Sequence, residues 1–143
     1  VKNGVLKTYL YNIETAKKDG VQTTGNGVNS GSKIGVSPFY LELKPGNKTL
    51  EQAFAYVDNG IYITELQGAH AGLNPTSGNF SLKASGFLIE GGKLTRPVNL
   101  ITVSGNLLQL FKDIEEVAND TKVYSSGIAT PSVVIKSLSI GGN

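Results

Sequence analysis

The sequence predicts one α+β domain in which strands dominate and form a twisted, mostly antiparallel sheet, arranged as a distorted barrel or sandwich with two helices. The first observation is the stretch from Gly60 to Gly92, where two strand-like segments flank a centre rich in turn residues. The second is the glycine count, 18 in 143 residues, which is typical of many strands joined by turns. The third is that apolar residues recur at helical spacing in only two longer segments. A chain of this length is expected to form one core, so residues 1–143 are assigned to a single domain.

Two strands are expected at the centre of the chain. Residues 61–66 are mostly β-branched, aromatic or aliphatic, which predicts a strand buried on both faces. Phe80–Glu90 alternates in the same way and predicts its neighbour. Glu65 interrupts the first strand, and a carboxylate in a buried strand needs a partner. We expect that partner to be Arg96 or backbone amides.

The connection between these strands is rich in glycine, proline and asparagine, which predicts a shaped loop instead of a tight hairpin. A loop held by a rigid sheet is a common location for functional residues. The candidate site residues of this loop are His70, Asn74, Ser77 and Asn79.

The first third of the chain predicts little regular structure. Asn3-Gly4 is a turn signal, and Val5–Tyr11 has the composition of a strand. Residues 13–18 predict a short helix with Asn12 as its N-cap. Val21–Ser37 has no apolar periodicity and is expected to be a surface loop without elements.

The next segment predicts a strand, a turn and the first of the two main helices. Phe39–Leu43 follows Pro38 and has strand character, and residues 44–47 form a turn signal. Residues 49–58 predict a helix with Thr49 as its N-cap, because apolar residues fall on one face.

The last third predicts a strand, a helix and a final strand. Residues 98–103 have strand character, and Pro97 before them indicates an edge or a bulge. Residues 106–119 predict the second main helix. Asp120–Ile128 is expected to be a loop and Pro131–Ile140 a last strand. The apolar residues that define the helix are Leu107, Leu110, Phe111, Ile114 and Val117.

Composition argues against several classes of protein. The formal net charge is +2 and the basic residues form no block, whereas nucleic-acid binding needs a basic stripe, so no nucleic-acid partner is expected. The sequence has no cysteine, which is consistent with a reducing compartment, and the cytoplasm is the expected location. No segment has the roughly 18 consecutive apolar residues of a membrane span, so no membrane partner is expected.

The residue types do not assemble a catalytic centre. A zinc hydrolase needs about three protein ligands, and this sequence has one histidine, His70, and no cysteine. Ser77-Gly78 and Ser85-Gly86 have the composition of nucleophile turns but lack a histidine partner and a strand-turn-helix context. We therefore predict no catalytic residue, no metal site and no cofactor within these 143 residues.

Segments along nearly the whole chain carry a family resemblance through their order and spacing. They are Val5–Tyr11, Thr15–Lys18, Thr24–Gly27, Gly60–Leu66, Ser77–Ser81, Ala84–Glu90, Arg96–Val98, Ile101–Val103, Gly105–Leu107, Asn119-Asp120 and Pro131-Ser132. Together they resemble the C-terminal domain of the PmbA/TldD proteins, a metallopeptidase family also called modulator of DNA gyrase. The resemblance implies that the chain, which contains no methionine, is the C-terminal domain of a longer protein.

The resemblance also implies a function. Active members of this family resemble zinc peptidases with a His-Glu-x-x-x-His helix and a cysteine ligand from the C-terminal domain. Here the loop Tyr124–Gly127 near the chain end offers only hydroxyls, which favours the PmbA-like, or TldE-like, subunit. The implied role is that of a zinc-free partner that shapes a peptide-binding chamber in proteolysis or peptide maturation, with zinc only in the catalytic partner.

Under this reading the partners are a TldD-like or identical subunit and a peptide substrate, and the candidate loop faces the peptide or the partner. An alternative is a non-enzymatic interaction module that binds extended peptide or protein segments through its sheet edges.

Overall fold

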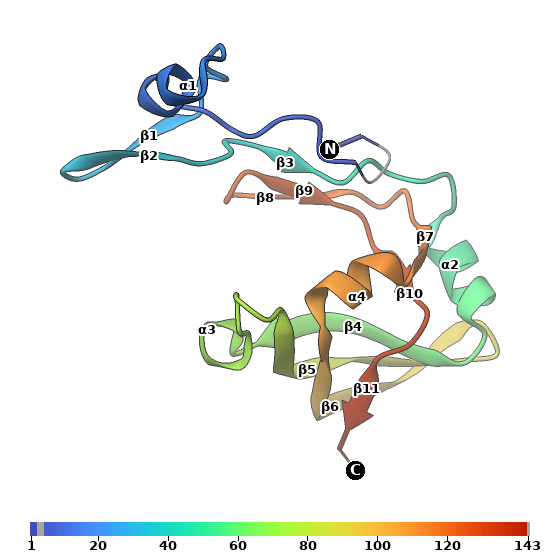
Figure 1. Cartoon of the computed structure of the whole chain (residues 1–143). Coiled ribbons are helices and arrows are strands. Elements are labelled where there is room, and N and C mark those ends of the chain that lie inside the picture. The colour runs from blue at the N-terminus through green and yellow to red at the C-terminus, as the bar shows by residue number, and fades with distance from the viewer. Residues whose placement is uncertain (3–4, 143) are drawn as a thin grey trace. The chain divides into compact units, whose positions relative to one another are not determined.

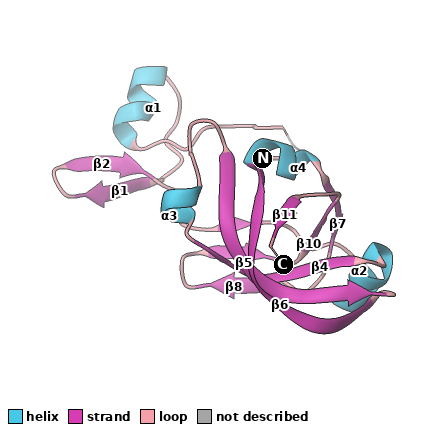
Figure 2. Cartoon of the chain, turned by 90° about the horizontal axis from the view of Figure 1, so that it is seen from below, coloured by secondary structure: helices cyan, strands magenta, loops and turns pink. Residues whose placement is uncertain are grey.

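The computed structural model describes residues 1–2 and 5–142 and is α+β, with 18% helix and 46% strand, which confirms the predicted class. Its sheets are open, so the barrel alternative is wrong. The chain divides into two compact units. Their elements are labelled in Figure 1, and Figure 2 colours the helices and strands. One unit is Val1–Glu42 with Val123–Ala129, and the other is Leu43–Lys122 with Thr130–Asn143.

The larger unit is built on a four-stranded antiparallel sheet of order β11-β6-β5-β4. The predicted central strands are confirmed as β4 (Gly60–Gln67) and β5 (Asn79–Glu90). The third strand, β6 (Lys93–Asn106), turns back immediately after β5, and β11 (Ser139–Gly141) adds the far edge. The sheet is therefore centred on the long β5–β6 pair.

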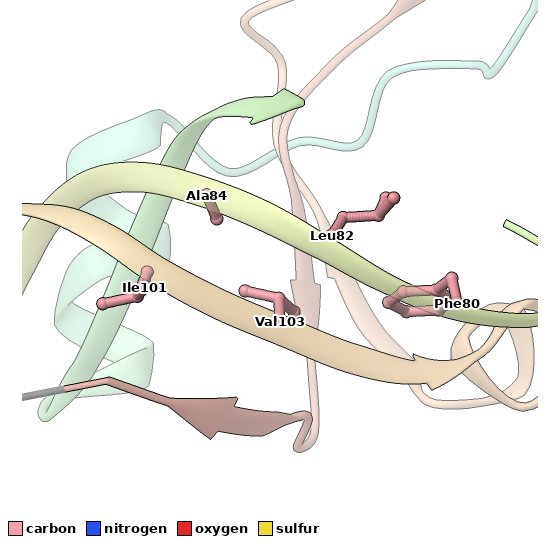
Figure 3. Close-up of a cluster of buried hydrophobic side chains, with 5 residues drawn as sticks. All are labelled: Phe80, Leu82, Ala84, Ile101 and Val103. Atoms are coloured by element: carbon pink, nitrogen blue, oxygen red, sulfur yellow. The ribbon is translucent and has the colours of Figure 1, made fainter. Parts of the chain in front are cut away.

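The core of this unit lies on one face of that pair. Alternation along residues 79–86 of β5 places every second residue inward, as expected for a strand with one covered face, and it breaks at the register shift between Phe87 and Ile89. Leu82 pairs with Val103 and Ala84 with Ile101, so the inward residues of the two strands meet (Figure 3). The buried cluster comprises Phe80, Leu82, Ala84, Ile101 and Val103.

The prediction that β4 is buried on both faces is wrong. Its first half is half-buried, but Thr64–Gln67 is exposed because β4 is the edge strand of the sheet. Glu65 is consequently in solvent contact and accepts a hydrogen bond from Gln67 Nε2 at 2.7 Å. The carboxylate needs no buried partner at this position.

The helix predicted at residues 49–58 is confirmed as α2 (Leu50–Val57). Thr49 and Gln52 form a reciprocal capping box, which satisfies backbone N–H groups at the helix start. Phe54 packs against Tyr62 with ring centroids 5.1 Å apart, and this contact anchors α2 to the sheet. The helix ends at Asp58, whose φ of 60° and ψ of −63° form a tight γ-turn closed by Asn59 N–H to Val57 O at 2.7 Å.

The helix predicted at residues 106–119 is wrong in its second half. The helix α4 (Leu107–Lys112) ends after six residues, and β7 (Ile114–Val117) follows it. β7 pairs antiparallel with β10 (Val133–Ile135), a partner far away in sequence. Apolar residues at spacings of three and four fit a helix by local pattern, but pairing with β10, whose three residues are all β-branched, decides the structure here.

Three further predictions near the C-terminal end need correction. The expected last strand at residues 131–140 is two strands, β10 and β11, which pair with different partners. The expected loop at residues 120–128 contains β8 (Lys122–Tyr124) and leads into β9 (Ile128–Thr130). These two strands form a small sheet with β3 (Leu41–Glu42), which is shorter than the strand predicted at residues 39–43.

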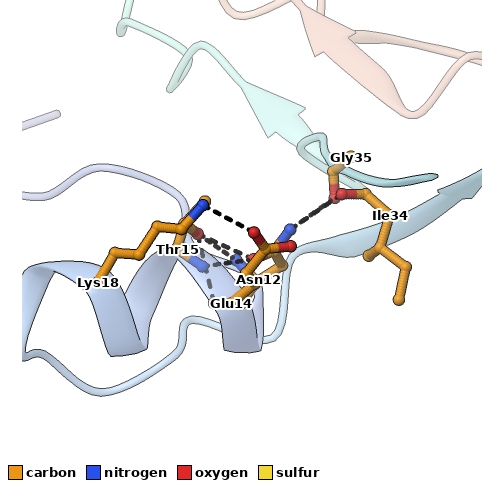
Figure 4. A network of polar contacts seen from close by, with 6 residues as sticks. All are labelled: Asn12, Glu14, Thr15, Lys18, Ile34 and Gly35. Carbon is orange, nitrogen blue, oxygen red and sulfur yellow. Dashed lines mark hydrogen bonds and ion pairs between the residues drawn. The ribbon is translucent and has the colours of Figure 1, made fainter.

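In the smaller unit, the predicted first helix is confirmed as α1 (Ile13–Asp19), and Asn12 is its N-cap. Asn12 Oδ1 accepts from Thr15 N–H at 2.8 Å, and Asn12 Nδ2 donates to Ile34 O at 3.1 Å (Figure 4). This buried asparagine therefore joins the helix to the hairpin of β1 (Gly27–Ser30) and β2 (Lys33–Val36). The hairpin lies where no element was predicted.

The strand predicted at residues 5–11 is not formed. An isolated bridge joins Lys2 to Val5, and the Tyr11 N–H donates to a side chain, Thr24 Oγ1, at 2.7 Å instead of to a neighbouring strand. A segment with strand composition remains irregular when it has no strand beside it. The turn predicted at Asn3-Gly4 lies outside the described residues.

Substitution of Val103 by alanine tests the core. Val103 is 1% exposed at the centre of the cluster, so removal of two methyl groups is expected to lower the free energy of unfolding by about 2 kcal/mol. Urea unfolding followed by circular dichroism measures the change. Leu108→Ala is the matched control, because Leu108 is 66% exposed and should change stability by less than about 0.5 kcal/mol. Equal effects of the two variants would contradict the assigned core.

Asp120 gives the larger unit a dependence on pH. Burial acts to raise the pKa of the Asp120 carboxyl, but hydrogen bonds from Ser132 N–H and Oγ, at 2.8 and 2.7 Å, together with Lys122 nearby, hold this pKa below its usual value. A lowered folded-state pKa adds stability above the unfolded pKa of about 3.9, and this stability is lost as pH falls through the folded-state value. We expect Asp120→Asn to be less stable than the parent at pH 7 and equally stable near pH 2. Urea midpoints across this range provide the measurement, and a constant difference would contradict the assignment.

Candidate functional site

The candidate residues lie together in the connection between β4 and β5. Its first part is the single-turn helix α3 (Ala69–Gly72), which starts after Gly68 in the left-handed region with φ 84°. His70 lies on this turn and is exposed. Gly72 passes so close to Ser81 O that a side chain at this position would collide with the strand. The close approach explains why the sequence has glycine here.

The second part of the connection is a turn organised by Asn74. Asn74 Oδ1 accepts from the backbone N–H of Thr76 at 2.9 Å and of Ser77 at 3.0 Å. Its backbone carbonyl accepts from Gly78 N–H at 2.8 Å, and its own N–H donates to Asn79 O at 2.9 Å. These four bonds close the loop onto the start of β5.

Asn106 links this turn to α4 and was not among the predicted site residues. Its Nδ2 donates to Ser77 O and to Asn79 Oδ1, both at 2.9 Å. Its Oδ1 accepts from the N–H groups of Leu108 and Gln109 at 3.1 and 3.3 Å, as an N-cap does. An asparagine immediately before an apolar helix is an N-cap signal in the sequence, but its contact with residues 27 to 29 positions earlier is not visible there.

The network determines what the four predicted residues can offer to a ligand. Three acceptor groups already have partners within this network. They are the side-chain oxygens of Asn74 and Asn79, and the Ser77 hydroxyl, which accepts from Asn79 N–H at 3.3 Å. The residues are thus brought into one ordered, exposed loop, with His70 on a neighbouring turn. Their contact with a peptide or a partner protein stays a prediction.

The loop Tyr124–Gly127 is the turn between β8 and β9. Gly127 N–H donates to Tyr124 O at 3.0 Å. Gly127 has a φ of 78°, and a Cβ at this position would collide with Phe39 O. The turn is exposed and offers the hydroxyls of Tyr124, Ser125 and Ser126, which are not the imidazole, thiolate or carboxylate ligands that zinc takes. These residues therefore do not fit a zinc ion.

Three further properties of the described residues concern metal ligands, membrane-spanning helices and depressions in the surface. Among residues 1–2 and 5–142, no group of three or more histidine, cysteine, aspartate or glutamate side chains could hold a metal ion. No helix within the same residues has the length and apolar character needed to cross a membrane. A depression of about 310 Å³ lies beside α4 and β11 and is lined by polar side chains such as Gln109, Asp113 and Ser139.

Comparison with known proteins gives one consistent family. The profile described as the PmbA/TldA metallopeptidase C-terminal domain matches residues 1–142. The metalloprotease PmbA homologue of Buchnera aphidicola (subspecies Baizongia pistaciae) is 35% identical over 99% of this chain and 30% of its own length. The metalloprotease PmbA of Escherichia coli O157:H7 is 30% identical over 99% of this chain and 29% of its own length.

Solved structures agree with these relatives. A Thermotoga maritima protein described as a modulator of DNA gyrase is 44% identical, with a TM-score of 0.90 over 99% of this chain and 32% of that one. TldE from Thermococcus kodakarensis is 28% identical, with a TM-score of 0.87 over 99% of this chain and 33% of that one. The chain thus spans about a third of the length of the proteins it matches. It belongs to the PmbA/TldD metallopeptidase family, in which it corresponds to the C-terminal domain.

Proposed function

We propose that this chain is the C-terminal domain of the zinc-free subunit of a PmbA/TldD-type peptidase, and that its loop at residues 68–79 helps to shape the chamber that holds a peptide. The observation that carries the proposal is the set of side chains that could bind zinc. The whole sequence has one histidine and no cysteine, and the turn Tyr124–Gly127 offers hydroxyls where the family resemblance implies a cysteine ligand. The similarity to proteins named PmbA and TldE supports the PmbA-like, or TldE-like, type of subunit.

The geometry of the loop supports a role in holding a peptide. The bonds of Asn74 and Asn106 fix the turn before any ligand arrives, so a peptide would meet a surface that costs little entropy to order. Exposed groups on α3 and on the turn are free to contact it. The partner in this proposal is a TldD-like subunit, which would carry the zinc, or an identical subunit, which would not. Neither nucleic acid nor membrane takes part. We expect a cytoplasmic location, which agrees with the absence of cysteine.

A second candidate function is a non-enzymatic module that binds extended segments by strand addition. The observation in its favour is that β4 is an edge strand with an exposed second half. Peptide cleavage in the presence of a zinc-carrying partner distinguishes the two candidate functions. The peptidase subunit requires this partner for cleavage, whereas the binding module does not involve cleavage.

The test of the proposed function measures zinc and cleavage together. The purified chain is expected to contain no stoichiometric zinc after dialysis and to leave unfolded casein intact, because it lacks a ligand set for zinc. Addition of a TldD-like subunit that retains His-Glu-x-x-x-His should give cleavage that a chelator abolishes. One zinc per chain, or chelator-sensitive cleavage by this chain alone, would contradict the proposal.

Two substitutions of Asn106 test the part played by the loop. Asn106→Asp keeps the acceptor that caps α4 but loses the donors to Ser77 O and Asn79 Oδ1. Hydrogen exchange is therefore expected to rise at residues 76–79 and to remain unchanged in α4. Asn106→Ala loses both functions, and loss of the cap should cost about 1 kcal/mol. If the loop shapes the chamber, both variants should weaken binding of a fluorescein-labelled unfolded casein peptide in the assembled enzyme, and unchanged binding would remove the loop from the proposal.

A further inference from the structure

An exposed asparagine precedes glycine at the start of β4, and such a pair of residues can rearrange covalently. The side-chain amide of asparagine reacts with the backbone nitrogen of the residue that follows it, and glycine leaves this nitrogen uncovered because it has no Cβ. The sequence contains three such pairs, Asn3-Gly4, Asn26-Gly27 and Asn59-Gly60. The first lies outside the described residues, so the structure allows the other two to be compared.

Asn26 is held by the smaller unit through both its backbone and its side chain. Its N–H donates to Tyr11 O at 3.2 Å, and its carbonyl accepts from Ser37 N–H at 3.1 Å. Its side-chain Nδ2 donates to Ser37 O at 3.2 Å, and the residue is half-buried. Movement of this amide toward Gly27 N therefore requires the end of the β1–β2 hairpin to open.

Asn59 is exposed and lies between the end of α2 and the start of β4. Its N–H donates to Val57 O at 2.7 Å in the γ-turn that ends the helix. Its Nδ2 donates to the carboxylate of the adjacent Asp58 at 2.8 Å, and its Oδ1 accepts from Gly91 N–H at 3.4 Å. Among the described residues, the side chain's single hydrogen bond beyond its own turn is this long one, so the amide can rotate toward Gly60 N while the turn stays folded.

We propose that Asn59 is a site of spontaneous deamidation, and that its products loosen the turn between α2 and β4. Gly60 N loses its proton to hydroxide and attacks Asn59 Cγ, which forms a five-membered succinimide as the bond from Cγ to Nδ2 breaks. The leaving nitrogen takes a proton from water and departs as ammonia. Water then opens either carbonyl of the ring, which gives aspartate or isoaspartate.

The contact with Gly91 favours this reaction chemically. Attack on Cγ moves negative charge onto Asn59 Oδ1, and Gly91 N–H already donates to this oxygen. A backbone N–H that donates to a developing oxyanion lowers the energy of the intermediate. The β5–β6 turn is held in place for this role, because Gly92 N–H donates to Asp58 O at 2.8 Å. The folded chain therefore both exposes the asparagine and supplies a donor for its reaction.

Either product changes the contact between these two turns. Aspartate at position 59 loses the donor to Asp58 and places a second carboxylate beside it, so the two charges repel. Isoaspartate adds a methylene group to the backbone between α2 and β4. Both changes act against the hydrogen bonds that join the end of α2 to the β5–β6 turn.

The first experiment compares the two asparagines within one sample. The purified chain is incubated at mildly alkaline pH, and peptide mapping by mass spectrometry follows each site through the mass gained when oxygen replaces the amide nitrogen. In the folded chain Asn59 is expected to react about tenfold faster than Asn26, because Asn26 reacts only after local opening. In urea the two rates should become similar, since each asparagine is then an unprotected neighbour of glycine. No reaction at Asn59, an equal or faster rate at Asn26 in the folded chain, or the same rate difference in urea would overturn the proposal.

The second experiment uses Asn59→Asp, which reproduces one of the two products. Its urea midpoint at pH 7 is expected to fall below that of the parent, and the difference should shrink near pH 2, where both carboxylates are protonated. Gln22→Glu is the matched control, because it makes the same change from amide to carboxylate at an exposed position and should leave the midpoint unchanged. An Asn59→Asp midpoint equal to that of the parent at pH 7 would contradict the expected effect on the turn.

Discussion

The long antiparallel pairing of β5 with β6 is the interaction on which the larger unit depends. Its register brings alternate side chains from both strands onto one face, where Phe80, Leu82, Ala84, Ile101 and Val103 form the buried cluster. Partly buried side chains from β4, α4 and the β10–β11 connection pack against the same cluster. The pairing also fixes the two ends of the candidate site, because Asn79 at the start of β5 lies opposite Asn106 at the end of β6.

The parts of the fold that the sequence predicts are those governed by local chemistry. The alternation of β5 and the capping residues Asn12 and Thr49 act within a few residues of their position, and each prediction from them is confirmed. The parts that fail are those where a distant partner decides. Residues 114–117 become a strand because β10 lies beside them. Residues 27–36 form a hairpin, which is joined to α1 by the hydrogen bond from the buried Asn12 to Ile34 O. Residues 5–11 have strand composition but no strand to pair with.

The candidate site shows the same division. Glycine, proline and asparagine between β4 and β5 indicate a shaped loop, and the structure has one. The residue that holds the loop to α4 is Asn106, and its role depends on the β5–β6 register, which no local pattern gives. The apolar neighbours of Glu65 predict a buried strand, but the position of β4 at the edge of the sheet puts this carboxylate in solvent.

β4 has the composition of a central strand but lies at the edge of the sheet. A strand with apolar residues on both faces would be expected at the centre of a sheet, and β4 has that composition although no strand pairs with its second edge in the described residues. Phe54 of α2 covers Tyr62 near the start of β4, but Thr64–Gln67 is exposed. The bulge at Thr64 moves Leu66 onto the core face, and this would be a liability in a monomer because it exposes apolar surface at an open edge.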